Sequence, residues 1–162
     1  MEIKVWNYIK EYEESKAEIF KALEEVFESG QLILGEKVKG FEKKYAEYCG
    51  VKYGVGVDNG TNAIILALYS LGIGKGDEVI TVSNTAIPTV SAIVTTGATP
   101  VFVDIDPQTY VMDTANIEQV ITKNTKAILP VHLFGQCADM DAIPESAPER
   151  IHRMIMILPV KS

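Results

Sequence analysis

The sequence predicts an α/β fold, in which helices cover both faces of a mostly parallel β-sheet. Short apolar segments such as VITV (79–82), VFVDI (101–105) and AILPV (127–131) alternate with segments of helical periodicity. These three segments are rich in apolar and β-branched residues, as is typical of parallel strands buried on both faces. The chain has 162 residues, which is the length of about one domain.

Two amphipathic helices are expected at the N-terminal end of the chain. Apolar residues recur at helical spacing over 11–28, and Gly30 is expected to end this helix. The segment QLILGEKV then reads as a loop. A second helix is expected over about 37–48, with aromatic residues on one stripe and Gly50 at its end.

Alternating strands and helices are expected after Gly50. YGVGV (53–57) predicts a first strand, and the apolar segment 61–72 predicts a helix that ends at Gly72. GKGDE reads as the turn that leads into the strand 79–82. A helix over 86–96 is expected in spite of Pro88, because proline is tolerated in the first turn.

The predicted pattern continues beyond strand 101–105 and then stops. Asp113 or Thr114 is expected to cap a helix that runs through Ile121, and DMDAI (139–143) reads as a helix opening with Asp139 as its cap.

Two prolines follow in PESAP, and the apolar segment IHRMIMILPV is a candidate strand with no helix after it. We therefore expect residues 144–162 to be a divergent tail that does not continue the pattern of residues 1–143.

Composition argues against several classes of function. The chain has 15 basic and 22 acidic side chains, a net charge of −7, whereas nucleic-acid binders carry basic patches. No apolar run reaches the roughly 18 residues of a membrane span, and the charged N-terminus lacks a signal-peptide core. Two cysteines without a CxxC pair argue against a disulfide scaffold and a zinc site. A cytoplasmic protein with no metal, membrane or nucleic-acid partner is expected.

The segment GVGVDNGTNAI (54–64) is the strongest candidate for a binding site. It predicts a strand, a turn and then a helix whose first residues are Gly60, Thr61 and Asn62. Unpaired amides and the helix dipole favour an anion at such an end, typically a phosphate. The alternative is an ordinary capped helix start, with Asn59 or Thr61 as the cap. A dinucleotide fingerprint is disfavoured, because the glycine after GVG comes one position too late.

Other polar residues follow the predicted strands. The loop SNTAIPT (83–89) and His132 are expected at the carboxyl edge of the sheet, where ligands of α/β proteins bind. A lone histidine near an apolar segment is more often a hydrogen-bonded structural residue than a catalyst. Asp104 and Asp106 look like paired carboxylates, but Asp-Pro after a strand is a common turn signal.

Four segments taken together resemble a known family. They are LGEKVKGFEKKYAEYCGVKYGVGVDNGTNAIILAL, GIGKGDEVITVSNTAIPTVSAI, GATPVFVDIDPQTYVMD and ILPVHLFGQCADMDAI. In this order they resemble the N-terminal part of the DegT/DnrJ/EryC1/StrS family of pyridoxal phosphate-dependent sugar aminotransferases, over about residues 3–143. The resemblance implies a partial type I aminotransferase fold, with residues 1–143 as the N-terminal part of the large domain, and a homodimer in the intact enzyme.

The resemblance also implies roles for individual residues. The amides of Gly60 and Thr61 and the Thr61 hydroxyl would hold the phosphate of pyridoxal 5′-phosphate, with Asn62 beside them. Ala86 occupies the position at which the family usually has an aromatic ring over the cofactor. GQLILG (30–35) is similar to the segment that approaches the sugar nucleotide or the partner subunit.

Two functional motifs of the family do not occur after DMDAI. The motif E-D-x-A-Q, with the acid that binds the pyridine nitrogen, is absent, and no lysine matches the Schiff-base position. No catalytic residue is therefore assigned, and the chain is expected to be a fragment that is inactive alone. From the family's strand order, 3-2-4-5-6-7-1, three strands should remain adjacent. YGVGV should lack a neighbour, and AILPV should have an open edge unless the tail covers it.

The resemblance implies amino transfer from an amino acid, with glutamate as the expected donor, to a nucleotide-linked keto sugar. VSNTAIPT is similar to members that aminate a 3-keto deoxysugar nucleotide, which would place the enzyme in deoxysugar or polysaccharide biosynthesis. The alternative is a shortened, non-catalytic protein that binds a phosphate ligand or pairs with a full-length relative. A third hypothesis is an unrelated nucleotide-binding α/β domain.

Overall fold

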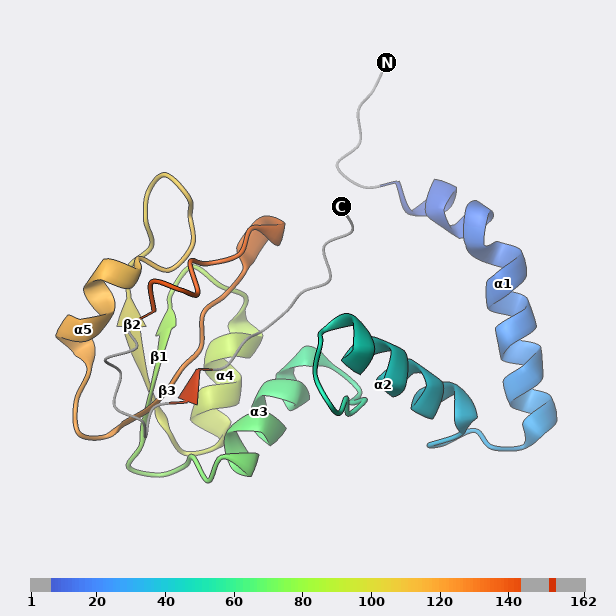
Figure 1. The fold of residues 1–162 in the computed structure, drawn as a ribbon, viewed down its shortest axis with the longest axis horizontal. Helices are drawn as coiled ribbons and strands as arrows, with labels where there is room; N and C mark the ends of the chain where they lie inside the picture. The colour runs from blue at the N-terminus through green and yellow to red at the C-terminus, as the bar shows by residue number, and fades with distance from the viewer. Residues whose placement is uncertain (1–6, 144–151, 154–162) are drawn as a thin grey trace, which may run out of the picture. The chain divides into compact units, whose positions relative to one another are not determined.

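The computed structural model describes residues 7–143 and 152–153 (Figure 1). The chain divides into two compact units, Met1–Gly56 and Val57–Ser162, and each is described by itself. Within the described residues, no helix combines the length and the apolar character that crossing a membrane requires.

The first unit contains the helices α1 (Tyr8–Ser29) and α2 (Glu36–Tyr48), which confirms both predicted helices. The side chain of Asn7 accepts a hydrogen bond from the Lys10 amide and caps α1. Gly30 ends α1 in the left-handed conformation, with φ of 67°, where glycine avoids the steric penalty of a Cβ. Within the described part of the chain, α1 buries none of its residues.

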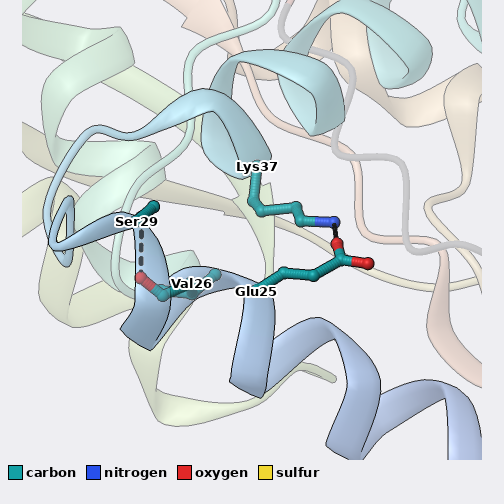
Figure 2. Close-up of polar contacts among 4 residues, drawn as sticks. All are labelled: Glu25, Val26, Ser29 and Lys37. Atoms are coloured by element: carbon teal, nitrogen blue, oxygen red, sulfur yellow. Dashed lines mark hydrogen bonds and ion pairs between the residues drawn. The ribbon is translucent and has the colours of Figure 1, made fainter.

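The corner between α1 and α2 is held by polar contacts (Figure 2). The Lys37 ammonium pairs with the Glu25 carboxylate across the loop, and the Ser29 hydroxyl donates a hydrogen bond of 2.7 Å to the Val26 carbonyl. The hydrogen bond and charge of Lys37 lower the pKa of Glu25. Both partners are largely solvent-exposed, so this ion pair contributes little to stability.

Residues 53–57 do not form the predicted strand. They follow α2 as irregular chain, and the Gly56 amide donates a hydrogen bond of 2.8 Å to Glu42 Oε1. The approach to α2 is close, because a Cβ on Gly54 would lie 2.7 Å from the Glu42 carbonyl oxygen. A strand needs a neighbour for its backbone groups, and the described residues offer none beside this segment.

The second unit is built on a parallel sheet of order β2-β1-β3-β4 (Figure 1). Its strands are β1 (Glu78–Val82), β2 (Thr99–Val103), β3 (Thr125–Ile128) and β4 (His152–Arg153). The first three confirm the expected neighbour order, with β1 between β2 and β3.

The boundaries of two strands differ from the prediction. β2 begins and ends two residues earlier than the expected 101–105: it pairs with β1 over Thr99–Val103, and Ile105 forms an isolated antiparallel bridge with Met112 instead. β3 likewise begins two residues earlier than 127–131, and it stops before Pro130, which has no amide to donate.

The edge of β3 is covered by β4. Ala127 pairs with His152 and Ile128 with Arg153, in parallel register. The candidate strand in the tail is thus present at these two positions. The rest of IHRMIMILPV lies outside the described residues.

Two apolar clusters show that helices cover both faces of the sheet, as predicted. Side chains alternate along β1: Val79 packs with residues of α3 (Gly60–Ser70) and α4 (Ile87–Thr95), while Ile80 and Val82 belong to the cluster on the other face. That second cluster includes Ile117, at the start of the short helix α5 (Ile117–Val120).

Two predicted helices differ from the observed ones. Asp113 caps as expected, accepting from the Ala115 amide, but a 3₁₀ turn over Thr114–Asn116 comes before α5. Residues 139–143 form bends rather than a helix opening, although Asp139 accepts a cap-like hydrogen bond of 3.1 Å from the Ala142 amide. Ile143 precedes a proline, which disfavours helical geometry at that residue.

Candidate functional site

The first turn of α3 presents unpaired backbone donors. Asn59 caps the helix: its side-chain oxygen accepts a hydrogen bond of 2.9 Å from the Asn62 amide, and its carbonyl accepts one of 3.0 Å from the Ala63 amide. Within the part of the chain that the structure describes, the amides of Gly60 and Thr61 donate no hydrogen bond. These two donors point from the positive end of the helix dipole and are available to an anion.

Asn62, the third residue of the predicted site, is held within the turn. Its side-chain nitrogen donates to both carboxylate oxygens of Asp58, at 2.8 and 3.0 Å, and its amide is taken by Asn59. The Asn59 side chain also donates to Asp58, at 2.9 Å. In this structure Asn62 therefore shapes the start of the helix, and a direct contact with a cofactor stays a prediction.

The backbone at Gly60 is open. A Cβ built on this glycine would meet no atom within 4 Å, so the backbone is open to an approaching group. Thr61 is half-buried, and its hydroxyl adds a possible donor next to the two amides. Two amides, a hydroxyl and open space suit the phosphate of pyridoxal 5′-phosphate.

Ala86 begins α4 at the same edge of the sheet. The Tyr69 hydroxyl bonds the Thr95 carbonyl at 3.5 Å and joins the C-terminal ends of α3 and α4, which lie side by side (Figure 1). Their N-terminal ends therefore both face the carboxyl ends of the strands. Ala86 is exposed and is the N-cap residue of α4. Its side chain is a methyl group, at the position where the family usually has an aromatic ring over the cofactor.

His132 is a structural residue in this fold. It is buried directly after β3, and its Nδ1 accepts a hydrogen bond of 3.1 Å from the Ala138 amide. Burial lowers the pKa of His132, which favours the neutral ring with its proton on Nε2. The histidine therefore connects two loop segments. This agrees with the structural role that the sequence favours over a catalytic one.

The carboxylates of Asp104 and Asp106 each accept a hydrogen bond from a nearby backbone amide. Asp104 accepts from the amide of Ile105, and Asp106 from the amide of Gln108 at 2.7 Å. Both bonds are short-range, as the Asp-Pro signal suggests.

A pocket at this edge brings together residues that the sequence did not predict to share a site. It is lined by residues that follow β2 and β3, among them Asp106, Thr109, Asp113, Cys137 and Asp139. The described residues contain no cluster of side chains arranged to hold a metal ion. The only sequence signal was the number of aspartates after predicted strands.

Comparison with known proteins places this chain in a family. The sequence model of the DegT/DnrJ/EryC1/StrS aminotransferase family matches residues 13–155. This match runs past residue 143, and the expected start of a divergent tail there stays a prediction. A dTDP-3-amino-3,4,6-trideoxy-alpha-D-glucose transaminase of Micromonospora megalomicea subsp. nigra is 57% identical over 90% of this chain and 39% of its own length.

Solved structures agree with the sequence comparison. The structure of S. venezuelae DesV in complex with a ketimine intermediate superposes with a TM-score of 0.82 at 45% identity, over 85% of this chain and 37% of DesV. The PLP form of the putative sugar aminotransferase Spr1654 from Streptococcus pneumoniae gives a TM-score of 0.78 at 35% identity, over 87% of this chain and 36% of Spr1654.

The chain thus spans less than two fifths of the length of each of these proteins. The match nevertheless includes the sheet, the helices on both faces and the first turn of α3. The partial type I aminotransferase fold is confirmed by these structural neighbours. The chain belongs to the DegT/DnrJ/EryC1/StrS aminotransferase family.

Proposed function

We propose that this chain forms the phosphate-holding part of a pyridoxal phosphate-dependent aminotransferase that acts on a nucleotide-linked keto sugar, with glutamate as the expected amino donor. The observation that carries the proposal is the pair of unbonded amides at Gly60 and Thr61 in a chain of this family. The Micromonospora relative, named for a dTDP-3-amino sugar, supports a 3-keto deoxysugar nucleotide as substrate.

The residues present would bind and orient the cofactor. When bound, pyridoxal phosphate supplies an electron sink for the amino-transfer chemistry. The amides of Gly60 and Thr61 and the Thr61 hydroxyl would hold its phosphate, and Asn59 would keep the first turn of α3 in place. Ala86 leaves the face of the cofactor ring without an aromatic partner from this loop.

The proposal assigns no covalent role to a lysine of this chain, because none matches the family's Schiff-base position. The 162-residue chain alone should therefore be inactive. Treatment with pyridoxal phosphate and borohydride, followed by peptide mapping, should give only scattered lysine modification. A single stoichiometric adduct would show that one lysine takes the covalent role, and would refute the proposed inactivity.

Phosphate binding is tested separately with pyridoxine 5′-phosphate, which carries the phosphate but no aldehyde. Titration of the ¹⁵N-labelled chain should shift the amide resonances of Gly60 and Thr61 with one common saturation curve. Thr61→Val should weaken binding by about tenfold, since it removes one hydrogen bond to a charged group. Thr61→Ser keeps the hydroxyl and should retain the affinity. Absence of shifts at Gly60 and Thr61 would refute the proposed site.

A further inference from the structure

The carboxylate of Asp58 is fixed directly before the proposed phosphate site. It accepts two hydrogen bonds from the Asn62 side chain, at 2.8 and 3.0 Å, and one of 2.9 Å from the Asn59 side chain. These neutral amides orient the carboxylate without adding a positive charge. Its position is two residues ahead of Gly60, where α3 begins.

The described lysines of the second unit lie away from this edge of the sheet. In the second unit, the lysines among the described residues are Lys75, Lys123 and Lys126. Lys75 lies in the turn before β1, and the other two lie just before or at the start of β3, so all three belong to the amino ends of the strands. At the proposed site itself, the end of the helix dipole supplies about half an elementary positive charge.

We propose that Asp58 sets the affinity of the phosphate site: its fixed carboxylate repels a bound phosphate dianion and keeps binding weak. This inference rests on the proposed function. The carboxylate and a phosphate dianion carry charges of the same sign, so they repel each other, and between solvent-exposed groups salt screens this repulsion. Replacing Asp58 with asparagine removes the charge and keeps an oxygen that can accept from Asn59 or Asn62.

The test compares D58N with the wild-type chain in titrations with pyridoxine 5′-phosphate, followed at the amides of Gly60 and Thr61. At low ionic strength, D58N should bind about three- to tenfold more tightly. The advantage should shrink toward none at about 1 M salt, where the Debye length is about 3 Å. Asp141→Asn is the matched control. Asp141 is exposed, in a segment whose apolar residues pack on the other face of the sheet. Its substitution should leave the affinity for pyridoxine 5′-phosphate unchanged.

The outcomes distinguish a failure of the role proposed for Asp58 from a failure of the proposed phosphate site. Binding by both chains with equal affinity, or weaker binding by D58N, would overturn the role of Asp58 and leave the phosphate site standing. A D58N advantage that persists unchanged in high salt would also overturn it, because the cause would then be the shape of the turn. If neither chain shows shifts at Gly60 and Thr61, the proposed function itself fails. A D58S variant repeats the test if D58N does not fold.

Discussion

His132 connects the segment after β3 to Ala138, and its protonation should affect stability. Burial lowers its pKa below the ordinary value of 6.5, so the unfolded chain binds this proton more readily than the folded one. The stabilising contribution is complete above pH 6.5 and is lost as the pH falls through the folded-state pKa. Wild-type protein should therefore lose more unfolding free energy between pH 8 and pH 5 than His132→Gln, as measured by urea denaturation. Equal losses would contradict this role.

The side chains at the start of α3 show how far sequence reasoning reaches at the scale of a residue. The segment DNGTNA predicts both a cap and an anion site, and the structure contains the cap at Asn59. The engagement of Asn62 with Asp58 was not predictable, because both asparagines and the aspartate have several possible partners in one turn. The structure leaves the amides of Gly60 and Thr61 unbonded, at the two positions that the sequence already indicated, and it engages Asn62 in the turn.

At the scale of an element, local patterns predicted most helices and strands. α3, α4 and β1 carry their own signals in apolar runs and a proline in the first turn. The segment 53–57 has a strand-like composition, but a strand also depends on a neighbour that its own letters do not specify. The same limit applies to 139–143, where burial of Ile143 and the following proline override the cap signal of Asp139.

The contact between residues 54–56 and α2 leads to a test with two glycines. Gly54→Ala should destabilise the first unit by about 1–3 kcal/mol, because the added Cβ would clash with a backbone oxygen of Glu42. Gly40→Ala is the control inside α2. A Cβ there meets nothing within 4 Å, and alanine should stabilise the helix by about 0.5–1 kcal/mol. Thermal unfolding followed by circular dichroism measures both. A neutral Gly54→Ala would mean that this segment does not pack closely on α2.

At the scale of the whole molecule, burial is divided unequally between the two units. Both apolar clusters lie in the second unit, while Ala46 is the one described apolar residue of the first unit that is buried. α1 buries none of its described residues and exposes Phe20 and Phe27. Few buried contacts imply a low free energy of local opening.

Hydrogen–deuterium exchange should therefore differ between the units. In the isolated 162-residue chain, amides of α1 should exchange orders of magnitude faster than those of β1, which is central in the sheet. Mass spectrometry of peptic peptides measures both segments in one experiment, so each serves as the reference for the other. Equal protection of α1 and β1 would mean that the exposed face of α1 is covered in solution, for example by a second copy of the chain.

The central claim is that the first turn of α3 holds the cofactor phosphate, and a crystal structure of the chain with pyridoxine 5′-phosphate tests it most directly. The account predicts the phosphate within hydrogen-bond distance of the amides of Gly60 and Thr61 and of the Thr61 hydroxyl. Asn62 should remain bonded to Asp58. A ligand bound at any other place, with the first turn of α3 left free, would contradict the account.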